Sequence, residues 1–148
     1  MFHFDKKDLK ALQPGRFRHV VSVRFQDVDA AGIVFFPRVL EYMHDAYVAA
    51  LAEIGSELHT VLRSRSWAAP LRHAEADYFS PLRFGDRVIV ALVAAHVQET
   101  EIVLGYRVSH EATGAVAAVG QTVHTFVDPK TFERTAVPDV IAAALRAL

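Results

Sequence analysis

One segment of the chain, from Pro37 to Ile54, has the hydrophobic spacing of a helix. Its apolar residues recur every three or four positions and form one wide stripe, which predicts an amphipathic helix with a single buried face. Pro37 fits the first turn, where its missing N–H is not needed, and Gly55 favours termination. At 1.5 Å per residue this helix is about 27 Å long. No other segment predicts a long amphipathic helix, so this one sets the architecture.

The remaining long segments have the alternating pattern of strands. Residues 17–25 predict a half-buried strand, with one face formed by Phe17, His19, Val21, Val23 and Phe25. Turn residues such as Thr113-Gly114 separate further apolar runs. Four more strands are therefore expected, near residues 67–79, 87–98, 101–112 and 115–127.

The strand near residues 101–112 alternates most clearly. Its apolar and polar faces consist, respectively, of Ile102, Leu104, Tyr106 and Val108, and of Arg107, Ser109 and Glu111. Short helices are expected at residues 5–12, 57–64 and 138–148. One long helix followed by consecutive strands predicts an α+β domain, in which a mostly antiparallel sheet of five to six strands wraps the helix.

Composition is typical of one globular domain spanning residues 1–148. The chain has 52% hydrophobic, 10% aromatic and 22% charged residues, which is too apolar for a disordered chain and too charged for a membrane protein. Its longest apolar run, Val88–Ala95, is far shorter than the roughly 18 residues that suggest a membrane-spanning helix. The N-terminal sequence MFHFDKKDLK lacks the apolar core of a signal peptide. We therefore expect a cytoplasmic protein.

The inventory of charged and reactive residues excludes several functions. Lys and Arg number 16 and Asp and Glu number 17, which leaves no basic field for nucleic acid or an anionic membrane. The absence of cysteine excludes disulfides and thiolate nucleophiles. His96, His110 and His124 lie 14 residues apart on expected strands, and neighbouring strands could bring them together. Spacing alone gives no ligand geometry, so we interpret them as ordinary strand residues and expect no metal site.

Two carboxylates, Asp27 and Asp29, come shortly before the expected helix. The N-terminal end of a helix has free N–H groups and a partial positive charge, which stabilise a developing oxyanion. A carboxylate beside it can act as a nucleophile or as a base for water. The small residues Ala30, Ala31 and Gly32 would let a substrate approach the backbone. From the residues alone, the alternative is that both aspartates only form Asx turns or cap the helix.

The run Phe25–Pro37, FQDVDAAGIVFFP, resembles the signature of 4-hydroxybenzoyl-CoA thioesterases, which are acyl-CoA hydrolases with the hotdog fold. The resemblance extends to Gly55 and to DYFSPLRFGDRV, and it covers most of residues 17–127. It implies a sheet wrapped around one long helix, and an enzyme with no cofactor other than the CoA of its substrate.

The resemblance also implies roles for individual residues. Asp29 matches the catalytic carboxylate, the backbone amide of Phe36 matches the donor that polarises the thioester carbonyl, and Asp27 is expected to hold the loop. The loop residues expected to contact the substrate are Gly32, Ile33, Val34 and Phe35. In the family the active sites form between two subunits whose sheets join edge to edge. A homodimer or a dimer-of-dimers tetramer is therefore expected, with no nucleic acid or membrane partner.

Two positions depart from the family pattern. Where 4-hydroxybenzoyl-CoA thioesterases have a helix acid that contacts the substrate phenol, this chain has His44. A histidine can hydrogen-bond a hydroxyl, or it can be a surface residue beside the apolar stripe. The basic cluster that binds the CoA phosphates is replaced by Gln98-Glu99-Thr100. Other cations would have to make these contacts, and the candidates are Arg83, Arg87, Arg107 and Lys130.

The leading hypothesis is an acyl-CoA thioesterase for a small, aromatic, hydroxybenzoyl-like acyl group, with Asp29 as nucleophile or general base. One alternative is a thioesterase for short- or medium-chain aliphatic acyl-CoA or for acyl carrier protein. A hydratase or dehydratase usually pairs an acid with a histidine in this loop, and residues 29–36 contain none. A non-catalytic module that binds acyl thioesters would not need an acid at the helix end.

Overall fold

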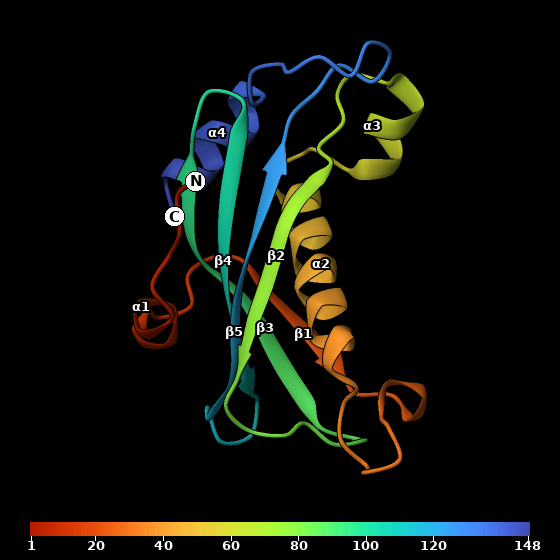
Figure 1. Ribbon diagram of the computed structural model, residues 1–148, viewed down its shortest axis with the longest axis vertical. Helices are drawn as coiled ribbons and strands as arrows, with labels where there is room; N and C mark the ends of the chain where they lie inside the picture. Colours follow the sequence, from red (N-terminus) through yellow and green to blue (C-terminus); the bar gives the residue numbers. More distant parts are fainter.

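The computed structural model describes all 148 residues, and its dominant feature is one long helix packed against a sheet (Figure 1). The five strands lie in the order β1-β3-β4-β5-β2, and every neighbouring pair is antiparallel. The strands are β1 Arg18–Ser22, β2 Leu71–Tyr78, β3 Arg87–Val97, β4 Glu101–His110 and β5 Val116–Thr125. The helices are α1 Lys6–Ala11, α2 Phe36–Glu53, α3 Leu58–Ser64 and α4 Asp139–Arg146, with a 3₁₀ turn, η1, at Phe25–Asp27. This arrangement confirms the expected α+β architecture.

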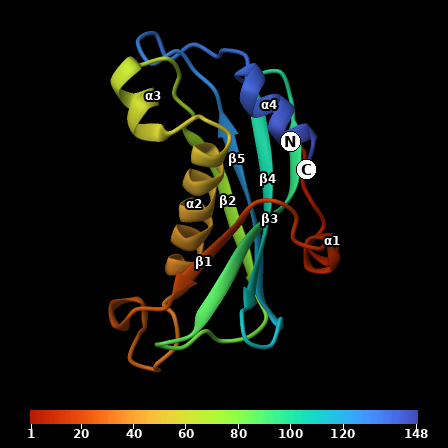
Figure 2. The same ribbon diagram turned by 180° about the vertical axis from the view of Figure 1, so that it is seen from behind.

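Helix α2 lies along one face of the sheet, which both views make clear (Figures 1 and 2). It has 18 residues and starts one position before the expected Pro37. The apolar stripe, represented by Met43 and Ala46, is buried and forms the core with the inner face of the sheet. Gly55 follows the helix with a φ of +80°, a conformation that glycine adopts without strain. The periodicity thus predicted both the helix and its buried face.

Strands β3, β4 and β5 form consecutive hairpins, whereas β1 and β2 do not. β3 pairs with β4, and β4 with β5, as expected for strands separated by short turns. β2 precedes them in sequence but pairs with β5, so β1 and β2 are the two edges of the sheet. β2 begins at Leu71 instead of residue 67, while the ends of β3, β4 and β5 differ from the expected ones by at most two residues.

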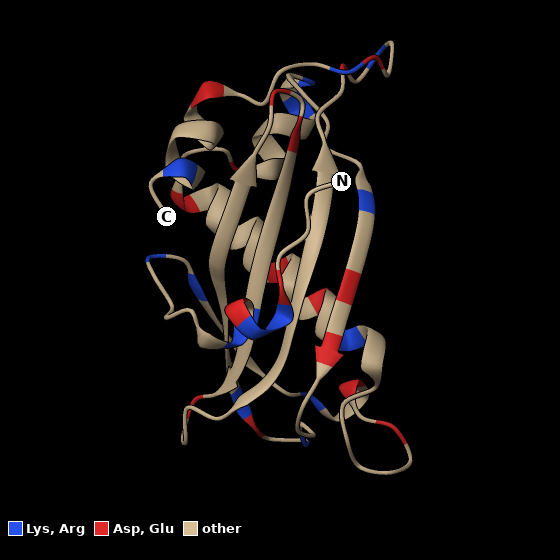
Figure 3. Cartoon of the chain, turned by 60° about the vertical axis from the view of Figure 1, so that its left-hand side comes forward, with Lys and Arg blue, Asp and Glu red and all other residues tan.

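Residues 1–12, which we call the N-terminal strap, cover the outer face of the sheet opposite α2 (Figure 3). Leu9 of the strap is buried in a small apolar cluster with Ala91 and Val119. The side-chain amide of Gln121 donates to the Phe4 carbonyl at 3.0 Å and accepts from the Phe4 N–H at 2.9 Å. The strap therefore gives the sheet a second covered face.

The strap changes the burial of β4. Arg107 and Ser109 have the polar-face positions that alternation predicted, yet both side chains are buried. Arg107 donates from Nη1 to the Leu12 carbonyl at 2.6 Å. The alternation of residue types is as predicted, and the strap covers the polar face of β4 at Arg107.

Strand β1 is shorter than its alternating pattern predicted. Phe17 and Val23 are buried as expected, but Phe25 lies in η1 with 75% of its surface exposed. The cause is Asp27, whose carboxylate accepts a hydrogen bond from the Arg24 N–H at 3.0 Å and turns the chain out of the strand.

Charges are scattered over the surface, with Lys and Arg interspersed among Asp and Glu (Figure 3). No helix in the structure combines the length and the apolar character needed to span a membrane.

Candidate active site

The loop between η1 and α2 is a fixed turn. Asp29 N–H donates to the Ile33 carbonyl at 2.9 Å, and Gly32 N–H donates to the Asp29 carbonyl at 2.9 Å. Gly32 has a φ of +77°, in the left-handed region that favours glycine. Ile33 also forms a backbone bridge to Arg83, in the connection between β2 and β3. The loop is therefore anchored at both of its sides.

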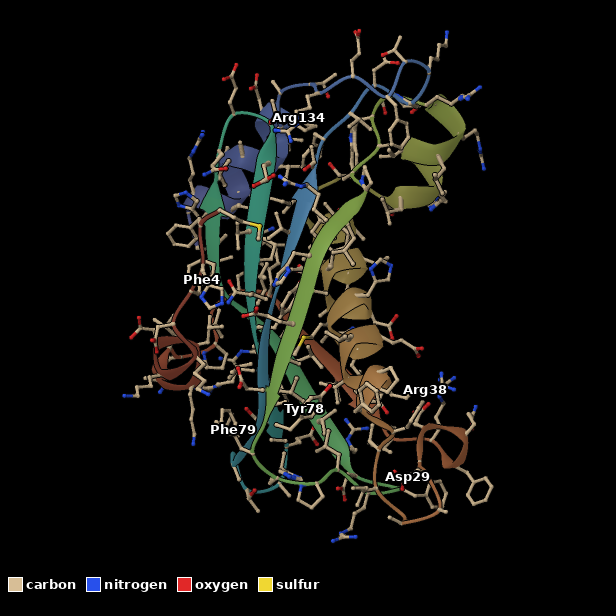
Figure 4. All side chains as sticks on the ribbon, viewed as in Figure 1. Phe4, Asp29, Arg38, Tyr78, Phe79 and Arg134 are labelled. Atoms are coloured by element: carbon tan, nitrogen blue, oxygen red, sulfur yellow. The ribbon has the colours of Figure 1, made fainter.

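Asp29 is exposed on this loop, below the N-terminal end of α2 (Figure 4). Its Oδ1 accepts a hydrogen bond from the Ala31 N–H at 2.8 Å, which is an Asx turn. No other side chain or backbone group donates to the carboxylate. The Asx turn considered from the sequence is present, but it leaves the second oxygen free to attack a carbonyl carbon or to accept a proton.

At the start of α2, the backbone N–H of Phe36 has no partner in the protein. Phe35 N–H donates to the Asp27 carbonyl at 2.8 Å, Arg38 N–H donates to the Phe35 carbonyl at 2.9 Å, and Pro37 has no N–H. Phe36 N–H lies between them and donates to no group of the chain. At the positive end of an 18-residue helix, this donor is suited to a developing oxyanion.

Asp27 has the opposite environment to Asp29, because it is completely buried. Its Oδ2 accepts from the Tyr42 hydroxyl at 2.8 Å, and its Oδ1 accepts from Arg24 Nη2 at 3.1 Å. Burial alone raises the pKa of Asp27, but the hydrogen bonds from Arg24 and Tyr42 together outweigh it and hold the pKa below its usual value. This carboxylate stays ionised, and its contacts fix the start of the loop.

An apolar cavity of about 470 Å³ lies beside the start of α2. Phe36, Ile33 and Val34 line one side, and the end of β2 lines the other. Tyr78 joins the end of β2 to the start of α2, since its hydroxyl donates to the Phe36 carbonyl at 2.7 Å (Figure 4). Of the loop residues expected to contact the substrate, Ile33 and Val34 line this cavity, whereas Gly32 and Phe35 are exposed outside its lining.

A second hollow, which we call the mid-helix cavity, lies between α2 and the strands β2 and β5. It has two adjoining parts of about 230 and 120 Å³, which share the lining residues His44, Tyr47, Leu71 and His124. His44 is an exposed residue of this lining, consistent with its place beside the apolar stripe. The centroids of the His44 and Tyr47 rings are 5.8 Å apart.

The sequence alone does not bring Tyr47 and His124 together. It places Tyr47 in the apolar stripe, as aromatic surface near His44, and His124 among the ordinary strand histidines. Alternation on β5 places His124 and Thr122 on the same face of that strand, and this was the available signal.

The three strand histidines do not converge. His96 stacks on Phe2 with ring centroids 3.9 Å apart, and His110 Nε2 lies 3.3 Å from Ser80 Oγ, while His124 lines the mid-helix cavity. No group of three or more metal-ligating side chains in the structure could hold a metal ion.

The four cations considered for the CoA phosphates have different surroundings. Arg107 is buried beneath the strap, so its candidacy is wrong. Arg87 forms two hydrogen bonds with Glu111, from Nε at 3.0 Å and from Nη2 at 3.3 Å. Arg83 and Lys130 are exposed and form no ion pair, and Arg83 alone adjoins the Asp29 loop through its bridge to Ile33.

Comparison with known proteins identifies related enzymes. A family model described as the thioesterase-like superfamily matches residues 23–145. The 1,4-dihydroxy-2-naphthoyl-CoA hydrolase of Rippkaea orientalis is 34% identical over 126 residues, which cover 84% of this chain and 91% of the relative. The enzyme of the same name from Synechococcus elongatus is 37% identical over 118 residues, which cover 79% and 85%.

The fold has a solved counterpart. The crystal structure of a 1,4-dihydroxy-2-naphthoyl-CoA thioesterase from Synechocystis matches with a TM-score of 0.83 and 27% identity, covering 89% of this chain and 96% of that one. This match confirms the hotdog fold. The resemblance to 4-hydroxybenzoyl-CoA thioesterases in particular is not confirmed, because the relatives have a different name and the match is at the level of the superfamily. The chain belongs to the thioesterase-like superfamily and is a thioester hydrolase.

Proposed function

We propose that the chain hydrolyses the CoA thioester of a hydroxylated aromatic acid. The observation that carries the proposal is the combination of a free Asp29 oxygen and a free Phe36 N–H on one short, anchored loop. The names of the relatives support an aromatic, dihydroxylated acyl group and CoA as its carrier. The apolar cavity beside Phe36 has room for the atoms next to the thioester.

In the proposed mechanism, the Phe36 N–H binds the thioester carbonyl oxygen. Asp29 either attacks the carbonyl carbon, which gives an acyl–aspartyl anhydride that water hydrolyses, or removes a proton from the water that attacks. The CoA thiolate leaves in both routes, and the other product is the free acid. Negative charge develops on the carbonyl oxygen in both routes, where one donor contributes roughly 10²- to 10³-fold in rate.

The proposed active form is a pair of chains joined through β2. This edge strand has an unpaired side, and its end residues Leu71 and Tyr78 are 55% and 47% exposed. Antiparallel self-pairing over the whole of β2 would set Leu71 opposite Tyr78 of the second copy. Because Leu71 lines the mid-helix cavity and Tyr78 bonds Phe36, the cavity of one copy would adjoin the Asp29 loop of the other. An active monomer in sedimentation experiments would contradict this arrangement.

A thiol-release assay tests the proposed activity. The panel contains 1,4-dihydroxy-2-naphthoyl-CoA, 4-hydroxybenzoyl-CoA, benzoyl-CoA, hexanoyl-CoA and hexanoyl acyl carrier protein. We expect the hydroxylated aryl-CoA thioesters to have the highest kcat/KM. A preference for either hexanoyl thioester would favour an aliphatic thioesterase. Binding without thiol release from any compound would favour a non-catalytic module.

A further inference from the structure

The polar groups deep in the mid-helix cavity form a chain of hydrogen bonds in which every donor hydrogen is used, and we call it the closed chain. His124 Nδ1 lies 3.4 Å from the Ala69 carbonyl oxygen, which can only accept, so this nitrogen is assigned the proton. Burial lowers the pKa of His124 to about 4, so its ring is neutral at neutral pH. Nε2 therefore accepts from the Thr122 hydroxyl at 3.1 Å, and the Thr122 oxygen accepts from Tyr106 at 3.2 Å. None of these groups has a hydrogen left for a ligand.

Tyr47 differs from them, because its hydroxyl has no partner in the protein. The residue is 95% buried, since only 5% of its surface is exposed, and its ring stacks on His124 with centroids 4.4 Å apart and planes at 19°. The one completely enclosed side-chain nitrogen or oxygen without a partner is Arg107 Nε, so the Tyr47 hydroxyl is not completely enclosed. Tyr47 lines the mid-helix cavity together with His44 and His124, and it also lines a small hollow that exposes no polar surface. The hydroxyl therefore opens into the mid-helix cavity.

We infer that Tyr47 is a specificity-determining residue, whose hydroxyl hydrogen-bonds an oxygen substituent on the aromatic ring of the acyl group. The inference rests on the proposed function and extends it to a residue that the motif does not contain. The stack on His124 fixes the direction of the Tyr47 ring, and the closed chain holds His124 in place. In this arrangement the thioester of the substrate lies at Asp29 of one copy. The aromatic ring of the acyl group crosses the β2 edge and enters the mid-helix cavity of the other copy. A buried hydroxyl without a partner favours a ligand that supplies one.

The test removes this hydroxyl and leaves the stacked ring. Tyr47→Phe and the wild type are assayed with 1,4-dihydroxy-2-naphthoyl-CoA and with 2-naphthoyl-CoA, which lacks the ring hydroxyls. We expect Tyr47→Phe to lower kcat/KM for the hydroxylated thioester roughly 5- to 150-fold, the range for losing a buried polar partner, and to leave 2-naphthoyl-CoA almost unchanged. The matched control is Tyr106→Phe, whose lost hydroxyl is already bonded to Thr122, and it should change both substrates by the same factor.

The outcomes separate the inference from the proposed function. Equal effects of Tyr47→Phe on both thioesters, or no effect on either, would overturn the role of Tyr47 while the activity stands. If the wild type hydrolyses neither naphthoyl thioester, the same comparison is made with 4-hydroxybenzoyl-CoA and benzoyl-CoA. A wild type that hydrolyses no hydroxylated aryl-CoA thioester would overturn the proposed function itself. Thermal melting checks that Tyr47→Phe is folded. If it is not folded, the wild type decides alone, and equal kcat/KM for the two thioesters would refute the inference.

Discussion

Asp27 and Asp29 are separated by one residue, and their environments could hardly differ more. Asp27 is completely buried, and Arg24 and Tyr42 use its lone pairs. Asp29 is exposed and accepts a single hydrogen bond, from Ala31. A carboxylate whose oxygens are all bonded can fix a loop but cannot easily take up a proton or attack a carbon. The buried Asp27 therefore fixes the loop that carries Asp29, and the exposed Asp29 is free to react.

The largest expected effect separates the two acids by activity. Asp29→Asn should lower kcat by at least about 10²-fold, because the amide can neither attack the thioester nor accept a proton from water. Its melting temperature should equal that of the wild type, since Asn can still accept the hydrogen bond from Ala31. Steady-state thiol release and differential scanning calorimetry measure the two quantities. Hydrolysis at a near wild-type rate would show that Asp29 is not the catalytic acid.

The second expected effect separates them by stability. Asp27→Asn should lower the free energy of unfolding by about 2–3 kcal/mol, because a buried charged acceptor of several hydrogen bonds is lost. Turnover should fall less than in Asp29→Asn. Urea titration followed by tryptophan fluorescence reports the stability through Trp67. Unchanged unfolding midpoints would mean that the Asp27 contacts do not support the fold.

A smaller change removes one donor from Asp27. Tyr42→Phe should cost about 1–2 kcal/mol of unfolding free energy, because Arg24 continues to bind the carboxylate. The double variant Asp27→Asn with Tyr42→Phe should lose less than the sum of the two single losses, since both act on one interaction. Strictly additive losses in the same urea titrations would argue that the two side chains are not coupled.

The smallest effect is a pH dependence. The pKa of Asp27 is lower in the folded chain than its usual value of 3.8, so ionised Asp27 stabilises the fold at all pH values above that. This contribution falls as the pH drops from 3.8 towards the folded-state pKa. The gap in unfolding free energy between the wild type and Asp27→Asn should therefore be constant near neutral pH and shrink in acid. A gap that is unchanged below pH 3 would contradict the lowered pKa.

The features that sequence predicted well depend on local spacing. The stripe of α2 and the alternation of β4 follow from the repeat of a helix and of a strand, so Met43 and Tyr106 were placed on buried faces. Asp29 and Phe36 were identified through a contiguous motif, and the structure leaves both with free hydrogen-bonding groups.

The features that sequence did not predict depend on contacts between distant segments. Arg107 looked like a surface cation because nothing in β4 reveals that residues 1–12 cover it. Tyr47 and His124 stack across 77 positions, counted from 47 to 124, so neither residue signals the cavity by itself. Asp27 could be assigned to the loop but its burial could not, because Tyr42 bonds it from the second turn of α2.

The N-terminal strap has a consequence for the order of folding. The two hydrogen bonds between Phe4 and Gln121 join positions 117 apart, and Leu9 packs against β3 and β5. During translation the strap is made well before the strands that receive it. Its apolar residues therefore cannot be buried until β5 has been synthesised and has paired with β4. Packing of the strap on the sheet is then a late step of folding, which follows the pairing of β4 and β5.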